Sequence, residues 1–134
     1  MNSRIFGFLV VLALISIIPV ANAQISIGAS AIQKSVEVII NSEGNVHVKH
    51  IVHSSNLPKD LELIYGTVSN ISVTDEQGKE LLFTTNNDNN MVLIQPSNEE
   101  STIEYDLEHV LVQTDNIWTW SFRYLETTSF ILPE

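Results

Sequence analysis

Residues 36–48 read Val-Glu-Val-Ile-Ile-Asn-Ser-Glu-Gly-Asn-Val-His-Val. Apolar residues at positions 36, 38, 40, 46 and 48 recur with a period of two, which is the spacing of a β-strand with one buried face. Between the two runs, Gly44 and Asn45 tolerate the positive φ that a tight turn requires. The stretch therefore predicts a β-hairpin with strands at 34–41 and 46–54.

The same period continues along the chain. Alternating or solid apolar segments at 61–65, 71–74, 79–85, 91–94, 103–108, 117–125 and 130–132 are separated by turn-forming residues. Seven or eight short strands at this spacing are typical of an all-β sandwich or barrel. We expect an antiparallel β-sandwich, immunoglobulin-like in the loose sense. Its expected core faces are Val36/Val38/Ile40, Val46/Val48/Val52, Leu61/Leu63/Tyr65, Ile103/Tyr105/Leu107 and Trp118/Trp120/Phe122/Tyr124.

Residues 1–23 predict a secretory signal peptide. One positive charge at Arg4 precedes the uncharged apolar run 5–20, and Ala21-Asn22-Ala23 has the small-x-small pattern of a cleavage site. Cleavage after Ala23 would leave a domain at 24–134. The alternative is an uncleaved anchor, although the run is shorter than the ~20 residues that span a bilayer. Both readings predict a secreted or cell-surface protein outside the cytoplasm.

Charge narrows the range of partners. The whole chain has a net charge of −10, and loss of Arg4 leaves five basic against sixteen acidic residues, a net charge of −11. Nucleic acids and anionic lipid headgroups attract Lys and Arg clusters, so neither is an expected partner. The chain has no cysteine, so the domain must rely on its apolar core rather than on disulfides.

The end of the sequence is apolar. Residues 130–134 read Phe-Ile-Leu-Pro-Glu and resemble the middle of a domain more than a polar tail. We expect truncation here, with a missing segment that could add strands, a metal site or a membrane anchor.

The residues Trp118, Trp120, Phe122 and Tyr124 have the most informative spacing in the chain. All four fall on one face of the strand expected at 117–125. That face can belong to the core, where aromatic side chains bury much area. It can also be an exposed platform for sugar rings or a peptide. The core reading is preferred, and the platform is the alternative.

Other polar patterns point less clearly to a site. His47, His50 and His53 cannot share one metal ion on a strand, because His50 faces away and the outer two lie ~20 Å apart. Glu104, Asp106 and Glu108 share a face, and with Asp88 they offer a weak calcium site as an alternative to solvated charge. Asn70-Ile71-Ser72 is a glycosylation sequon. No sequence motif of a catalytic nucleophile, zinc protease or phosphate-binding loop occurs, so we expect neither an enzyme nor a cofactor.

The hairpin at 36–48, followed by the series Trp118-x-Trp120-x-Phe122-x-Tyr124 and Leu132-Pro133, resembles exported β-sandwich ectodomains of archaeal and bacterial membrane-associated proteins. The resemblance implies an envelope location but carries over no site residues. We therefore expect a non-enzymatic binding or structural module at the cell envelope, with an envelope protein or glycan as partner. The alternatives are a carbohydrate-binding or calcium-dependent domain using the aromatic row, and an enzyme whose decisive part lies beyond Glu134.

Overall fold

The computed structural model describes residues 28–134, so the expected signal peptide at 1–23 lies outside the described part. The described chain is all-β, with no helix. Accordingly, none of residues 28–134 belongs to a helix with the length and apolarity to cross a membrane. The strands are β1 (Ala29–Ser30), β2 (Gln33–Ile40), β3 (Val46–Val52), β4 (Lys59–Glu62), β5 (Thr67–Asp75), β6 (Phe83–Thr85), β7 (Met91–Ile94), β8 (Ser101–Glu108), β9 (Val112–Thr114), β10 (Ile117–Thr119) and β11 (Thr128–Ile131).

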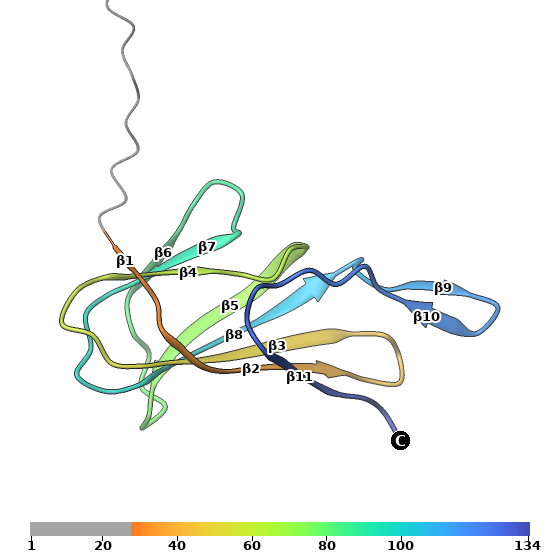
Figure 1. Cartoon of the computed structure of the whole chain (residues 1–134), viewed down its shortest axis with the longest axis horizontal. Coiled ribbons are helices and arrows are strands. Elements are labelled where there is room, and N and C mark those ends of the chain that lie inside the picture. Colours follow the sequence, from red (N-terminus) through yellow and green to blue (C-terminus); the bar gives the residue numbers. More distant parts are fainter. Residues whose placement is uncertain (1–27) are drawn as a thin grey trace, which may run out of the picture.

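Two sheets contain most of these strands (Figure 1). The larger sheet has the order β11-β2-β3-β8-β5, and the smaller has the order β1-β4-β7-β6. The strands β9 and β10 form a separate hairpin that projects from one end of the domain (Figure 1).

Both larger sheets are mixed. The pairs β1–β4 and β11–β2 are parallel, whereas the other pairs are antiparallel. The expectation of a purely antiparallel architecture is therefore wrong at β1 and β11. Residue alternation reports which face of a strand is buried, and it contains no information on the direction of the neighbouring strand.

The hairpin expected at 34–41 and 46–54 is confirmed as β2 and β3, with Val38 opposite Val48. Its turn is stabilised by Asn41, whose side-chain oxygen accepts hydrogen bonds from the backbone N–H groups of Glu43 and Asn45. Gly44 has a φ of 81°, a conformation that side chains with a Cβ rarely adopt.

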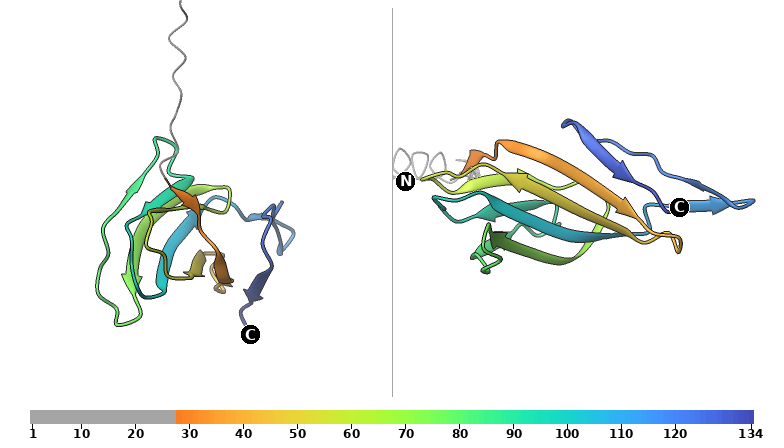
Figure 2. Two further views of the ribbon diagram at one scale, coloured as in Figure 1. Left: turned by 60° about the vertical axis from the view of Figure 1, so that its left-hand side comes forward. Right: turned by 90° about the horizontal axis from the view of Figure 1, so that it is seen from below.

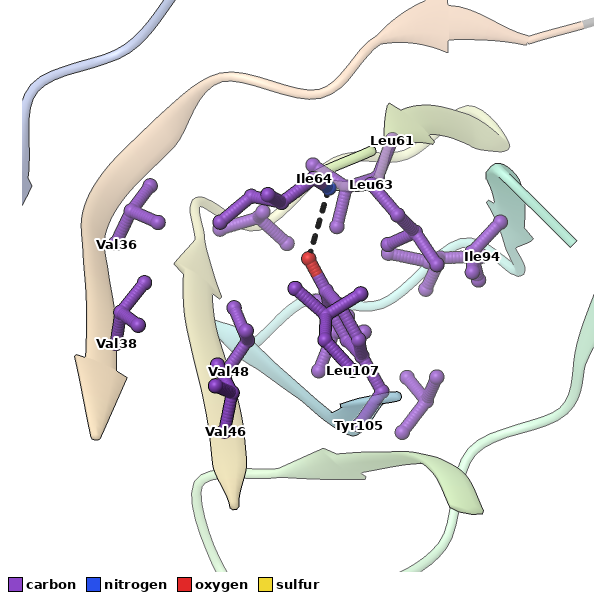
Figure 3. Close-up of a cluster of buried hydrophobic side chains, with 14 residues drawn as sticks. Val36, Val38, Val46, Val48, Leu61, Leu63, Ile64, Ile94, Tyr105 and Leu107 are labelled. Carbon is purple, nitrogen blue, oxygen red and sulfur yellow. Dashed lines mark hydrogen bonds between the residues drawn. The ribbon is translucent and has the colours of Figure 1, made fainter. Parts of the chain in front are cut away.

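Both sheets contribute to one apolar core (Figure 3). In β3 and β8 every second residue is buried, as the period of two predicts. Tyr105 lies at the centre, and its hydroxyl accepts a hydrogen bond from the backbone N–H of Ile64 at 2.9 Å. The core residues are Val36, Val38, Val46, Val48, Val52, Leu61, Leu63, Ile64, Val73, Val92, Ile94, Ile103, Tyr105 and Leu107.

Two expected core faces need correction. Tyr65 is 85% exposed, and Ile64 is buried in its place. The alternation fails there because β4 ends at Glu62, after which both Leu63 and Ile64 turn inward. The second correction concerns the aromatic row, which is not an inner face of one strand. Trp118 is 43% exposed, and the other three side chains are only partly buried.

Residues 120–127 form a non-strand segment between β10 and β11 (Figure 2). Tyr124 connects this segment to both sheets: its hydroxyl donates to the carbonyl of Glu62 at 2.8 Å and accepts from the side-chain amide of Gln33 at 2.9 Å. Gln33 begins β2 of the larger sheet, and Glu62 ends β4 of the smaller one. The segment therefore bridges the two sheets on one side of the core.

Candidate functional site

The three histidines do not form a metal site. His50 is fully buried, whereas His47 in β3 contacts Asp106 on the outer face and His53, directly after β3, contacts Glu100. Among residues 28–134 no group of three or more histidine and carboxylate side chains is placed to hold a metal ion. The opposite orientations of His50 and the outer pair agree with the strand geometry expected from the sequence.

His50 belongs to a buried chain of hydrogen bonds. Its Nδ1 lies 2.7 Å from Oε1 of Gln33, and its Nε2 lies 2.9 Å from the Tyr105 hydroxyl. Because Oε1 of Gln33 can only accept, Nδ1–H of His50 donates to it, and Nε2 of the neutral ring then accepts from the Tyr105 hydroxyl. Burial lowers the pKa of His50 to about 4, which keeps the ring neutral as this pattern requires. The Gln33 amide continues the chain to Tyr124, so the network connects the core to residues 120–127.

The three carboxylates on one face of β8, which we call the carboxylate row, are Glu104, Asp106 and Glu108. They face solvent, and two of them contact basic or amide groups. Asp106 accepts hydrogen bonds from Asn70 and His47, and these two contacts lower its pKa. Glu104 lies 3.8 Å from the ammonium of Lys49. Asp88 belongs to the β6–β7 connection of the other sheet, so the structure does not unite it with the row. The calcium alternative therefore gains no support.

Asn70, the sequon residue, is exposed and has a φ of 53°. It lies where the register between β5 and β8 shifts, at a β-bulge. Its side-chain nitrogen, which a glycan would modify, donates to Asp106 at 2.8 Å. The sequon is thus accessible, although its amide already has a hydrogen-bond partner.

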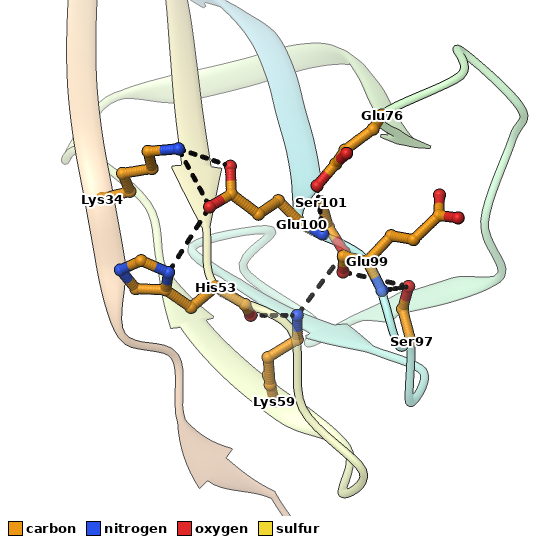
Figure 4. Close-up of polar contacts among 8 residues, drawn as sticks. All are labelled: Lys34, His53, Lys59, Glu76, Ser97, Glu99, Glu100 and Ser101. Atoms are coloured by element: carbon orange, nitrogen blue, oxygen red, sulfur yellow. Dashed lines mark hydrogen bonds and ion pairs between the residues drawn. The ribbon is translucent and has the colours of Figure 1, made fainter.

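A polar cluster lies at the C-terminal end of β3, next to His53 (Figure 4). Lys34 makes an ion pair of 2.8 Å with Glu100, which also contacts His53. Lys59 is buried, and its ammonium donates to the His53 carbonyl at 2.8 Å and contacts the Ser101 hydroxyl at 3.5 Å. Burial lowers the pKa of Lys59. These contacts connect the ends of neighbouring strands, and Ser101 is too deeply buried to meet a substrate.

A group of aromatic side chains lies elsewhere, around β10 and β11. Trp120, Phe122 and Phe130 form an edge-to-face cluster with ring centroids 5.0–6.2 Å apart. Together with Trp118 they line a hollow of about 580 Å³, which we call the aromatic groove. Its other lining residues come from the β2–β3 turn, Leu111 and the C-terminal tail, and none is charged. The groove is therefore an apolar surface on an acidic protein.

A second hollow of about 1100 Å³, which we call the polar hollow, lies beside residues 121–126 and is lined by charged as well as apolar residues. Its charged members are Asp60, Glu62, Arg123 and Glu126. Alternate residues separate the two hollows: Trp120 and Phe122 line the groove, whereas Ser121 and Arg123 line the polar hollow. The period of two seen in the sequence therefore persists beyond the end of β10.

Sequence reasoning found three members of the aromatic groove and missed Phe130. Tyr124, grouped with them in the sequence, instead lines the polar hollow and bonds to the core network. Phe130 was recognised only as part of a last extended piece, since nothing local shows that β11 returns beside β2 and brings it to Trp120.

Comparison of the chain with protein-family models, with curated proteins and with solved structures finds no match. Function must therefore be argued from the geometry above. The resemblance to exported β-sandwich ectodomains stays a prediction.

Proposed function

We propose that the chain is an exported, non-enzymatic binding module at the cell envelope, and that the aromatic groove is its ligand site. The fold we propose for it is a β-sandwich, immunoglobulin-like in the loose sense. The apolar core contributed by both sheets supports this architecture.

The observation that carries the proposal is the aromatic groove itself. Three aromatic side chains pack edge to face and stay only partly covered, and Trp118 beside them is 43% exposed. Apolar surface of this kind is costly on a soluble domain, and concave aromatic surfaces are typical of binding sites. Trp120 and Phe122 also pack against the core, which fixes the groove to the rest of the domain.

The export part of the proposal rests on residues 1–23 and on the acidic composition. The expected partners are an envelope protein or a glycan, with no role for nucleic acid. Attachment to the membrane would occur through an uncleaved signal or through a segment following Glu134.

A carbohydrate ligand is the second candidate, and Trp118 favours it. An exposed indole offers a flat apolar face on which the C–H face of a sugar ring can stack. The groove has no charged lining residue, so hydrogen bonds to sugar hydroxyls would come from Asn41, Ser42 and the backbone.

Tryptophan fluorescence tests the proposal. In Trp120→Phe the remaining signal reports Trp118, which should be quenched by acrylamide more readily than Trp120 in Trp118→Phe. Soluble cell-wall oligosaccharides and synthetic extended peptides are then titrated against each protein. We expect one ligand class to change Trp118 emission saturably. Binding of this ligand, measured by calorimetry, should be about tenfold weaker in Trp118→Ala and unchanged in Leu82→Ala, which removes another exposed apolar side chain. Absence of binding by both classes would contradict the proposal.

A further inference from the structure

We propose that β11 accepts an extended segment of a partner protein as an additional strand, and that alternate side chains of this segment enter the aromatic groove. The inference rests on the proposed function, because it names the partner for the same groove. It selects the protein partner over the glycan.

The strand β11 is one of the two edge strands of the larger sheet, and β5 is the other. It pairs with β2 through four consecutive positions, and within residues 28–134 no strand pairs with its other edge. An edge strand presents unpaired N–H and C=O groups, which can bind another extended chain. Phe130 and Ile131 are also 44% and 46% exposed, so this edge is apolar as well as open.

The opposite edge of the same sheet is protected. In β5, Asn70 creates a bulge with a positive φ, and the N–H of Leu81 donates to the carbonyl of Val73 at 2.8 Å. Bulges and covering segments are the devices that keep edges from pairing with other chains. By contrast, β11 contains no charged residue, no proline and no register shift against β2. The edge at β5 is therefore protected against pairing with another chain, whereas the edge at β11 is open to it.

The geometry of β11 defines the chemistry of the added strand. Phe130 lies opposite the buried Val38, so it points to the core side of the sheet, where it contacts Trp120 and Phe122. Every second side chain of an added strand would point to that side and adjoin the groove. These residues should be apolar.

The side chains between them would point to the outer side, next to Ser129. Ser129 lies opposite Glu37 of β2, and the chain as a whole has a net charge of −10. Charge complementarity therefore favours Lys or Arg at these positions. The same argument disfavours a second copy of this chain, because pairing β11 with itself would bring together two acidic domains through four uncharged residues.

The test uses NMR on the isotope-labelled, secreted product of the full chain. The probe is a synthetic peptide of about eight residues, a usual strand length, that alternates valine and lysine. A second peptide with the same side chains is N-methylated at every residue, which removes its backbone donors. A third alternates valine and glutamate, and a cell-wall oligosaccharide serves as the glycan probe.

We expect the valine–lysine peptide to shift the backbone signals of Ser129, Phe130 and Ile131 together with the indole signal of Trp118. N-methylation should weaken binding at least tenfold, about the effect of losing one or two hydrogen bonds. The valine–glutamate peptide should also bind more weakly. Trp118→Ala should weaken binding by about tenfold, the effect of removing an aromatic anchor, whereas Leu82→Ala should leave it unchanged.

Each contrary result has a distinct meaning. Equal binding of the methylated and unmethylated peptides at the groove would overturn strand addition and leave the proposed function intact. Binding of the oligosaccharide alone would do the same and select the glycan alternative. Shifts of β11 signals that depend on protein concentration alone would identify a second copy as the occupant and overturn the partner assigned here. Absence of any binding at roughly millimolar probe would overturn both proposals.

Discussion

Replacing Tyr105 by phenylalanine tests the buried hydrogen-bond chain that connects the core to the aromatic segment. The substitution removes one oxygen atom and keeps the ring, so the packing against its apolar neighbours stays nearly constant. It leaves the backbone N–H of Ile64 without its acceptor and Nε2 of His50 without its donor. Both residues are almost fully buried, so water cannot replace the missing partner without a rearrangement.

The expected loss of stability follows from these two groups. A buried polar group that loses its partner costs about 1–3 kcal/mol, so Tyr105→Phe should lower the free energy of unfolding by about 2–4 kcal/mol. In a domain of about this size each kcal/mol corresponds to a fall in Tm of roughly 4–8 °C. The measurement is urea denaturation at about pH 7.5, where His50 is neutral in both the folded and the unfolded state.

Tyr65→Phe provides the matched control, because it removes the same oxygen from a side chain that is 85% exposed. Its effect should stay within about 0.5 kcal/mol of the parent protein. If Tyr105→Phe were no more destabilising than Tyr65→Phe, the claim that these two buried hydrogen bonds stabilise the fold would be refuted. A reduced effect accompanied by a new signal for protonated His50 would show that the ring had changed partners.

Three further predictions concern pH, the turn and the core. Because burial lowers the pKa of His50 to about 4, the unfolded state binds its proton first as the pH falls. Stability should therefore decrease by about 3 kcal/mol between about pH 6.5 and pH 4, and His50→Gln should flatten this part of the profile; equal slopes for both proteins would exclude His50 as the cause. Gly44→Ala and Gly78→Ala should each cost about 1–2 kcal/mol, since both glycines have a positive φ. Only Gly44→Ala should also shift the Trp118 emission, because its Cβ would lie 2.8 Å from the indole ring, and equal spectra for the two variants would contradict this contact. Leu61→Ala should cost about 2–5 kcal/mol in urea denaturation, whereas Leu82→Ala, exposed by 82%, should be close to neutral; similar losses would contradict the assigned core.

Much of the strand content could be predicted because it depends on local patterns. The valines of β2 and β3 and the apolar residues of β8 alternate with polar ones, and in each case the predicted face is buried. The turn at Gly44 could also be predicted, since few residues other than glycine adopt the positive φ found there. Prediction failed at Tyr65, where the strand ends and two consecutive residues turn inward.

Only part of the aromatic groove could be predicted from the sequence. The spacing of Trp118, Trp120 and Phe122 showed a shared side, but it could not show whether another layer covers that side. In the structure only part of the aromatic surface is covered, by Phe130 arriving from β11. The hydrogen bonds of the buried His50 could not be predicted either, because its partners Gln33 and Tyr105 lie 17 and 55 residues away along the sequence.

The sequence by itself determined the hairpin, the alternating strand faces, the acidic character and the expectation of export. These properties follow from neighbouring residues, and neighbouring residues are what a strand period or a turn depends on. Only the tertiary structure decided that β1 and β11 join their sheets in parallel, that residues 120–127 bridge the two sheets, and that the aromatic row borders an open groove. These features depend on which distant segments meet, and that choice is made by the packing of the whole chain around one core.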